Sequence, residues 1–104
     1  MEITEVELKN KIENGEKLLV DFYGTWCMPC KRLKPIYEKV SQENDSEVGM
    51  YMMDVDLNKD FAMSLGIRSV PTIKVFNKGE VVDTKVGLLS EETIKGLITT
   101  VLHG

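Results

Sequence analysis

The sequence has few cysteines and no long hydrophobic run, and both shortages exclude classes of protein. A secreted domain of this size that depends on disulfides usually has several cysteines spread along the chain. This chain has two, both within residues 27–30, so a bridge between them closes a very small loop and adds little stability. The apolar runs, such as residues 18–20, are far shorter than the roughly 20 residues of a membrane-spanning helix. We therefore expect neither a disulfide-stapled scaffold nor a membrane protein.

Histidine is also scarce, and acidic residues outnumber basic ones by 17 to 13. Structural zinc normally takes four Cys or His ligands, and the only histidine, His103, stands at the C-terminal end. A zinc half-site is thus a remote alternative, and we expect no metal. The net charge of -4 at pH 7 disfavours nucleic acid and anionic membranes as partners. Residues 1–7 are acidic and lack the basic and apolar regions of a signal peptide, which predicts a cytoplasmic protein.

The remaining composition is that of one ordinary globular domain. The chain has 104 residues, of which 42% are hydrophobic and 29% charged, a balance that argues against disorder. No internal repeat, low-complexity stretch or linker rich in Pro, Gly or Ser interrupts it. We expect a single domain over residues 1–104.

Helical and strand patterns alternate along the chain, which predicts an α/β fold. Thr4 and Glu7 fit a capping box at the start of the first helix, which Asn14-Gly15 ends. The continuous apolar run Leu18–Tyr23 predicts a strand buried on both faces. Further helices are expected over residues 28–43 and 58–65 and after Ser90, and further strands over residues 48–55, 72–76 and 81–86.

The order of these elements predicts a mixed sheet with helices on both faces. The first strand–helix–strand unit should be a right-handed crossover between parallel strands. Asn77-Lys78-Gly79 is typical of a hairpin, so the last two strands should pair in antiparallel fashion.

The two cysteines are placed for chemistry. Their spacing is within disulfide reach when the second cysteine starts a helix. Cys30 falls on the buried stripe of that helix, whereas Cys27 precedes its first turn and should face solvent. Pro29 suits the first turn, where a missing N–H costs nothing. The unpaired N–H groups and positive dipole end of a helix favour a thiolate at Cys27. The pattern predicts an exposed nucleophile and a buried resolving thiol; a structural disulfide without turnover is the alternative.

Asp21 is an acidic residue inside the otherwise apolar run 18–23. Burial should raise the pKa of its carboxyl group, and such groups gather at functional sites. The alternative is an aspartate that turns to an edge of the sheet and is satisfied by hydrogen bonds. The residues alone leave both interpretations open.

The segment around the cysteines, residues 20–31 with the sequence VDFYGTWCMPCK, closely resembles the active-site region of the thioredoxin family. The likeness covers nearly the whole chain: it extends to Pro35, residues 66–72, the hairpin at 77–79 and Val86-Gly87. It implies a thioredoxin fold, with a mixed central sheet flanked by helices on both faces and a first strand that is short or absent. The motif is of the Trp-Cys-X-Pro-Cys type, with Met28 at X.

The resemblance implies a protein-disulfide reductase that acts in electron transport and cell redox homeostasis. Cys27 would be the nucleophile and Cys30 the resolving thiol, with a redox-active disulfide between them. Asp21 would be the acid/base that helps to deprotonate Cys30. The chain shows no glycine-rich nucleotide motif, so we expect no cofactor. A thioredoxin reductase, linked to flavin or to ferredoxin, would recharge this monomeric carrier.

A substrate-binding surface is also implied by the resemblance, with six members: Trp26, Met28, Pro29, Val70, Pro71 and Gly87. Pro71 corresponds to the family's cis-proline, and the backbone before it, at Val70, pairs with the substrate chain. From the residues alone, Pro71 could be an ordinary strand-start proline, Trp26 a core residue and Gly87 a simple strand-end turn.

Two positions depart from the family pattern. Met28 stands where most members have glycine, and Met52 stands where many bacterial members have a lysine near the buried aspartate. We hypothesise that Asp21, without this cation, is harder to ionise than in those relatives. Two other functions stay open: a disulfide oxidant or isomerase, and a non-catalytic binding or accessory module on the same fold.

Overall fold

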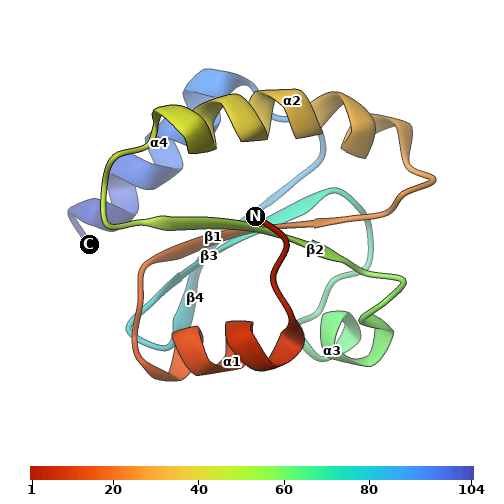
Figure 1. Cartoon of the computed structure of the whole chain (residues 1–104), viewed down its shortest axis with the longest axis horizontal. Coiled ribbons are helices and arrows are strands. Elements are labelled where there is room, and N and C mark those ends of the chain that lie inside the picture. The colour runs from red at the N-terminus through yellow and green to blue at the C-terminus, as the bar shows by residue number, and fades with distance from the viewer.

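A computed structural model describes all 104 residues and contains every expected helix and strand (Figure 1). For every element whose residue range was predicted from the sequence, each end in the structure lies within one residue of the predicted end. The elements follow the chain in this order: α1 (Glu5–Glu13), β1 (Leu18–Tyr23), α2 (Met28–Glu43), β2 (Gly49–Asp54), α3 (Lys59–Ser64), β3 (Thr72–Asn77), β4 (Glu80–Val86) and α4 (Glu91–Leu102).

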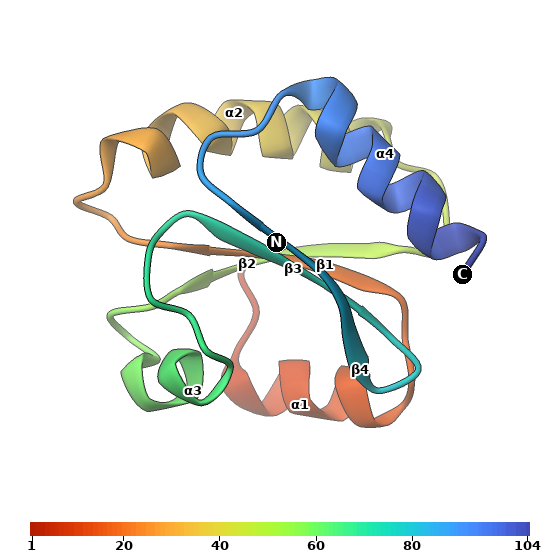
Figure 2. The same ribbon diagram turned by 180° about the vertical axis from the view of Figure 1, so that it is seen from behind.

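The four strands form one sheet in the order β2-β1-β3-β4. β1 and β2 are parallel, whereas β3 is antiparallel to both β1 and β4. Helices α2 and α4 cover one face of the sheet, and α1 and α3 cover the other (Figures 1 and 2). The predicted mixed sheet with helices on both faces is confirmed. No strand precedes α1; a single bridge between Glu2 and Met52 stands in its place, as expected for a first strand that is short or absent.

The central strand β1 divides the core into two layers because its side chains alternate between the faces of the sheet. Leu19 belongs to the larger cluster, beneath α2 and α4. Leu18, Val20 and Phe22 belong to the smaller cluster, against α1. Asp21 lies in phase with Leu19, so its carboxyl group points into the layer below α2.

Local signals in the sequence explain where helices and turns begin. The Thr4 hydroxyl accepts the N–H of Glu7 at 3.1 Å and the Glu7 carboxylate accepts the N–H of Thr4 at 3.0 Å, so the capping box is confirmed. The Ser90 hydroxyl caps α4 by accepting the N–H of Thr93. In the hairpin, Lys78 and Gly79 both have positive φ, 56° and 83°, the conformation of a two-residue type I′ turn.

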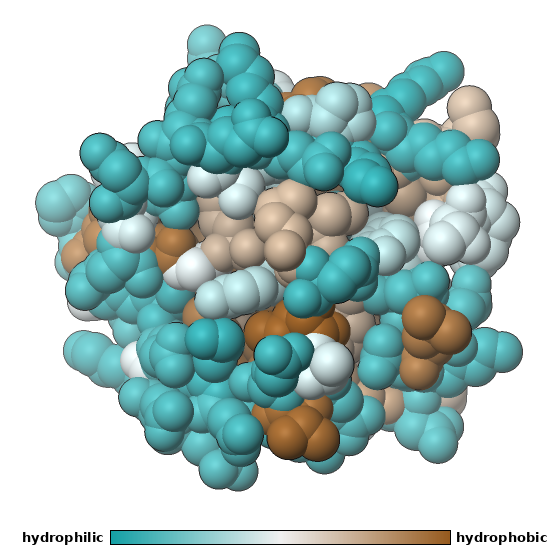
Figure 3. Space-filling view, viewed as in Figure 1, coloured by the Kyte–Doolittle hydropathy of each residue, from teal (hydrophilic) through white to brown (hydrophobic).

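The surface is mostly polar, with isolated apolar patches on the face that Figure 3 shows. None of the helices has both the length and the apolar character that crossing a bilayer would require.

Candidate active site

The two cysteines lie where β1 gives way to α2. Cys27 is the N-cap residue of α2, and its sulfur accepts the backbone N–H of Cys30 at 3.2 Å. Pro29 lies in the first turn, where a backbone N–H would have no partner within the helix, so the N–H that proline lacks is not missed. The cysteines form a disulfide with their Cα atoms 5.2 Å apart, so the spacing produces the expected bridge.

The expected exposure of Cys27 is wrong for this disulfide form, because its side chain is only 5% exposed. Cys30 is 4% exposed, so both sulfurs are sheltered. The cause is a loop distant in sequence: the Cys27 sulfur lies 3.6 Å from the carbonyl oxygen of Val70. The neighbours of Cys27 are open instead, with Trp26 65% and Met28 58% exposed. In this form the Val70 loop covers the Cys27 sulfur, while the side chains of its two chain neighbours stay open to solvent.

The Val70–Pro71 peptide bond is cis, which confirms the expected conformation at Pro71. The carbonyl oxygen of Pro71 accepts the N–H of Gly87 at 2.9 Å, so the loop before β3 and the end of β4 are tied together. Gly87 has a φ of 98°, a conformation that disfavours any other residue. Val70, Pro71 and Gly87 thus lie together next to Cys27, at the end of the sheet where β3 begins and β4 ends.

Trp26 is held in place by a partner that the sequence did not indicate. Its indole Nε1 donates to the Asp56 carboxylate at 2.7 Å, although most of the ring is exposed. Asp56 follows β2 in a turn, where its own backbone N–H donates to Asp54 at 2.8 Å. No local pattern links Asp56 to Trp26, because the contact joins two loops that are distant in sequence. The alternative that Trp26 is a core residue is excluded, because the residue is mostly exposed.

A groove of about 220 Å³ runs beside Trp26, between α3 and the loop that carries the cis bond. Lys59 and Arg68 also line it, so the groove joins an apolar floor to basic side chains. The apolar lining residues are Trp26, Val55, Ala62, Met63, Ile67 and Val70. Of the expected substrate-binding residues, Trp26 and Val70 line this groove, whereas Met28, Pro29, Pro71 and Gly87 are not among its lining residues.

The Asp21 side chain has no access to solvent, and neither carboxylate oxygen has a hydrogen-bond partner. Desolvation, with a smaller contribution from the charge of Glu2, raises the pKa of Asp21 from 3.8 to about 7. The raised pKa is confirmed, and the alternative of an edge-facing, hydrogen-bonded aspartate is wrong. Met52 is its register partner on β2 and Ile73 its partner on β3, so apolar side chains stand on both sides.

The active-site region also includes two residues that no local motif identified. The Tyr23 hydroxyl donates a hydrogen bond to the Glu2 carboxylate, and both lie near Asp21. Nothing in the sequence connects them, since Glu2 precedes the first helix and Tyr23 ends β1. As to metals, no group of three or more His, Cys, Asp or Glu side chains is arranged to hold an ion.

Comparison with known proteins identifies relatives of this chain and of its fold. The family model "Thioredoxin" matches residues 1–100. Thioredoxin from Rickettsia typhi is 38% identical over 93 residues, which cover 88% of this chain and 89% of that protein. Thioredoxin from Staphylococcus epidermidis is 38% identical over 94 residues, which cover 90% of this chain and 89% of that protein.

Solved structures agree with the sequence matches. Thioredoxin from Plasmodium falciparum superimposes with a TM-score of 0.85 at 33% identity, over 96% of this chain and 98% of that one. A mutant thioredoxin from Halobacterium salinarum gives a TM-score of 0.83 at 34% identity, over 96% of this chain and 87% of that one. Because the identities are 33% and 34% over 96% of this chain, these matches indicate related proteins and not only a shared fold.

Proposed function

This chain belongs to the thioredoxin family, and from that premise we propose how its residues divide the work of disulfide reduction. The protein is a thiol–disulfide oxidoreductase with protein-disulfide reductase activity. The observation that carries the proposal is the Cys27–Cys30 disulfide at the start of α2. Two sulfurs joined at a helix N-terminus, in a chain of this family, form a redox centre rather than a structural bridge.

In the reduced protein, Cys27 is the nucleophile. The N–H of Cys30 points at its sulfur, 3.2 Å away, and the positive end of the α2 dipole lies at the same place, so a thiolate is stabilised there. The thiolate attacks one sulfur of a substrate disulfide and forms a mixed disulfide. The other substrate sulfur leaves as a thiolate and takes a proton from water.

Cys30 then completes the exchange. Its thiol gives a proton to the Asp21 carboxylate, and the resulting thiolate attacks the Cys27 sulfur. The Cys27–Cys30 bond forms while the bond from Cys27 to the substrate breaks, and the second substrate thiolate departs. Two electrons have passed from the dithiol to the substrate, and Asp21 must lose its proton to water before the next cycle.

The substrate chain docks on the surface around Cys27. The carbonyl oxygen of Val70 lies 3.6 Å from the reactive sulfur and belongs to a loop distant in sequence, so a peptide bonded to Cys27 would run alongside Val70. Trp26 supplies an exposed ring that Asp56 keeps in one orientation. The remaining members of the surface are Met28, Pro29, Pro71 and Gly87.

Several finer assignments belong to the same proposal. The protein is a one-domain, Trp-Cys-X-Pro-Cys type member, with Met28 at X, that acts as a monomer in the cytoplasm, where thiols are kept reduced. It holds no cofactor and receives electrons from a thioredoxin reductase. Recharging by NADPH with a flavoprotein reductase, compared with recharging by reduced ferredoxin and its reductase, identifies the partner class. Sedimentation at several concentrations tests the monomer.

Insulin reduction driven by dithiothreitol tests the roles of the two cysteines. Cys27→Ser should reduce the turbidity rate to that of dithiothreitol alone. Cys30→Ser should retain the first attack and accumulate a mixed disulfide, which mass spectrometry detects. Wild-type rates in Cys27→Ser would contradict the proposal and favour a non-catalytic binding module.

A further inference from the structure

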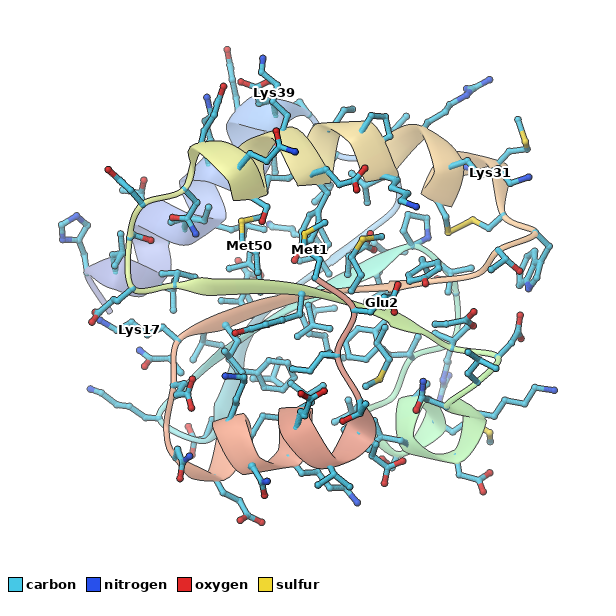
Figure 4. The ribbon with its side chains drawn as sticks, in the orientation of Figure 1. Met1, Glu2, Lys17, Lys31, Lys39 and Met50 are labelled. Carbon is cyan, nitrogen blue, oxygen red and sulfur yellow. A yellow bond between two sulfur atoms is a disulfide. The ribbon has the colours of Figure 1, made fainter.

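The N-terminal segment brings an anion next to the buried aspartate. The N–H of Met52 donates to the carbonyl oxygen of Met1 at 2.8 Å, and the N–H of Ile3 donates to that of Met52 at 3.0 Å. These bonds make the bridge that aligns Glu2 with Met52, and Met52 is in turn aligned with Asp21. Residues aligned across parallel strands point to the same face, so Glu2, Met52 and Asp21 form a row. Figure 4 shows the Glu2 side chain on the side of the sheet that α2 covers.

Tyr23 fixes the position of the Glu2 carboxylate. It lies two residues after Asp21 in β1, so both side chains point into the layer below α2. The Tyr23 hydroxyl donates to Glu2. Tyr23 and Met52 also line a hollow of about 210 Å³ together with the resolving cysteine, Cys30. Asp21 is next to both residues, because it lies two positions before Tyr23 in β1 and is aligned with Met52 on the neighbouring strand β2.

The charges around Asp21 are unbalanced towards the negative. None of the ion pairs in the protein includes Asp21. Of the exposed lysines of α2, Lys31 and Lys34 line the hollow, whereas Lys39 pairs with Glu91 at 2.9 Å. β3 places the apolar Ile73 opposite Asp21. Besides Glu2, the titratable groups that interact with Asp21 or line the hollow are Tyr23 on β1 and Cys30, Lys31, Lys34 and Tyr37 on α2. Asp54 on β2 interacts with Tyr23. The other charged residues of α2 do not line the hollow, and α4 faces this layer with the apolar Ile94, Leu97, Ile98 and Val101. The Tyr37 hydroxyl is occupied, because it donates to two backbone carbonyls.

We propose that Glu2 is a positioning residue for the resolving step. Tyr23 holds the Glu2 carboxylate in the row with Met52 and Asp21, and the charge of this carboxylate sets the pH at which Asp21 can accept the proton of Cys30. The inference rests on the role of Asp21 in the proposed function. A carboxylate near Asp21 opposes ionisation, the reverse of what a cation there would do. In line with this geometry, the charge of Glu2 adds to burial in raising the pKa of Asp21.

Glu2→Gln removes this charge with little other change, because the amide oxygen can still accept the Tyr23 hydroxyl. The ionisation midpoint of Asp21, followed by carboxyl ¹³C NMR, should move to lower pH by roughly half a unit, as for one like charge in a partly solvated site. The pH profile of the resolving step, measured by stopped-flow release of substrate thiol, should move by the same amount. Tyr23→Phe keeps the charge of Glu2 but removes the hydroxyl that holds its carboxylate in place. The ionisation midpoint of Asp21 should therefore also move to lower pH, by less than in Glu2→Gln.

Glu5→Gln is the matched control. Glu5 lies at the start of α1 and pairs with Lys9 at 2.8 Å, so this variant loses the same formal charge without altering the row beside Asp21. Its midpoint should equal that of the wild type.

An unchanged or raised midpoint in Glu2→Gln overturns the inference, as does an equal shift in Glu5→Gln. The NMR midpoint requires no turnover, so this failure is distinct from failure of the proposed function. A midpoint that moves while the profile of the resolving step does not would show that Asp21 is not the base, which contradicts the proposed function and the inference together.

Discussion

Replacement of Asp21 by asparagine should stabilise the disulfide form at neutral and alkaline pH but not in acid. The folded protein holds the proton of Asp21 up to a pKa of about 7, whereas the ordinary value is 3.8. Between these values the folded state binds a proton that the unfolded chain has released. The stability of the wild type therefore falls as pH rises through this window, and the loss is complete above the folded pKa.

The size of the effect follows from the pKa shift of this fully buried group. A rise from 3.8 to about 7 is roughly three units, and each unit is about 1.36 kcal/mol, so the wild type should lose on the order of 4 kcal/mol between pH 4 and pH 8. Asparagine does not ionise and escapes this loss. In acid, the asparagine amide and the protonated carboxyl group are both neutral and both lack hydrogen-bond partners, so burying them costs similar free energy. The free energies of unfolding of the two proteins should therefore differ by about 1 kcal/mol or less.

Urea unfolding from pH 4.5 to 8.5, with the disulfide intact, measures the difference. The free energy of unfolding is extrapolated to water for Asp21→Asn and wild type at each pH, after agreement of two spectroscopic probes has established two-state behaviour. Asp45→Asn, at an exposed aspartate, controls for the change in net charge.

A stability difference between Asp21→Asn and wild type that is the same at every pH would show that the folded and unfolded states release the Asp21 proton at the same pH. A wild type that gains stability relative to Asp21→Asn as pH rises would show that Asp21 is stabilised as an anion. Either result contradicts the raised pKa.

Three further predictions test other parts of the structure. Met52→Lys places a cation beside Asp21, so the NMR midpoint of Asp21 should fall and the pH-dependent loss of stability should shrink; an unchanged midpoint would contradict the register. Tyr37→Phe removes the hydroxyl that lies 3.0 and 2.9 Å from the backbone carbonyl oxygens of Leu19 and Tyr51, and the lost hydrogen bonding should cost about 0.5–1.5 kcal/mol in urea unfolding. Gly79→Ala forces a side chain into a φ of 83° and should cost roughly 1 kcal/mol, whereas Gly96→Ala inside α4 should not destabilise the protein.

The features that the sequence predicted well are those with a local physical cause. The capping box at Thr4 and the cap at Ser90 depend on residues three positions apart, so the helix starts could be placed closely. The strand Leu18–Tyr23 is apolar on both faces because helices cover both sides of the sheet. The burial of Asp21 follows from the same run, and the direction of its pKa shift was therefore predictable.

The features that the sequence did not predict arise from contacts between distant segments. Cys27 looked exposed because it precedes the first helical turn, but the Val70 loop, brought close by the fold, shelters its sulfur. The bond from Trp26 to Asp56 joins exposed polar atoms of two loops, and the bond from Tyr23 to Glu2 depends on the bridge that aligns the N-terminal segment with β2. Periodicity carries no information about such pairs.

Disulfide reduction by this protein depends on the start of α2, which makes the Cys27 sulfur nucleophilic and keeps Cys30 buried for the resolving step. Iodoacetamide labelling of the reduced protein from pH 4 to 9, with peptide mapping, measures this for each cysteine separately. We expect iodoacetamide to alkylate Cys27 well below the pH at which an ordinary thiol of pKa about 8.5 reacts, while Cys30 stays unlabelled. Equal labelling of both cysteines, or a rate profile for Cys27 like that of cysteine in an unfolded peptide, would contradict this expectation.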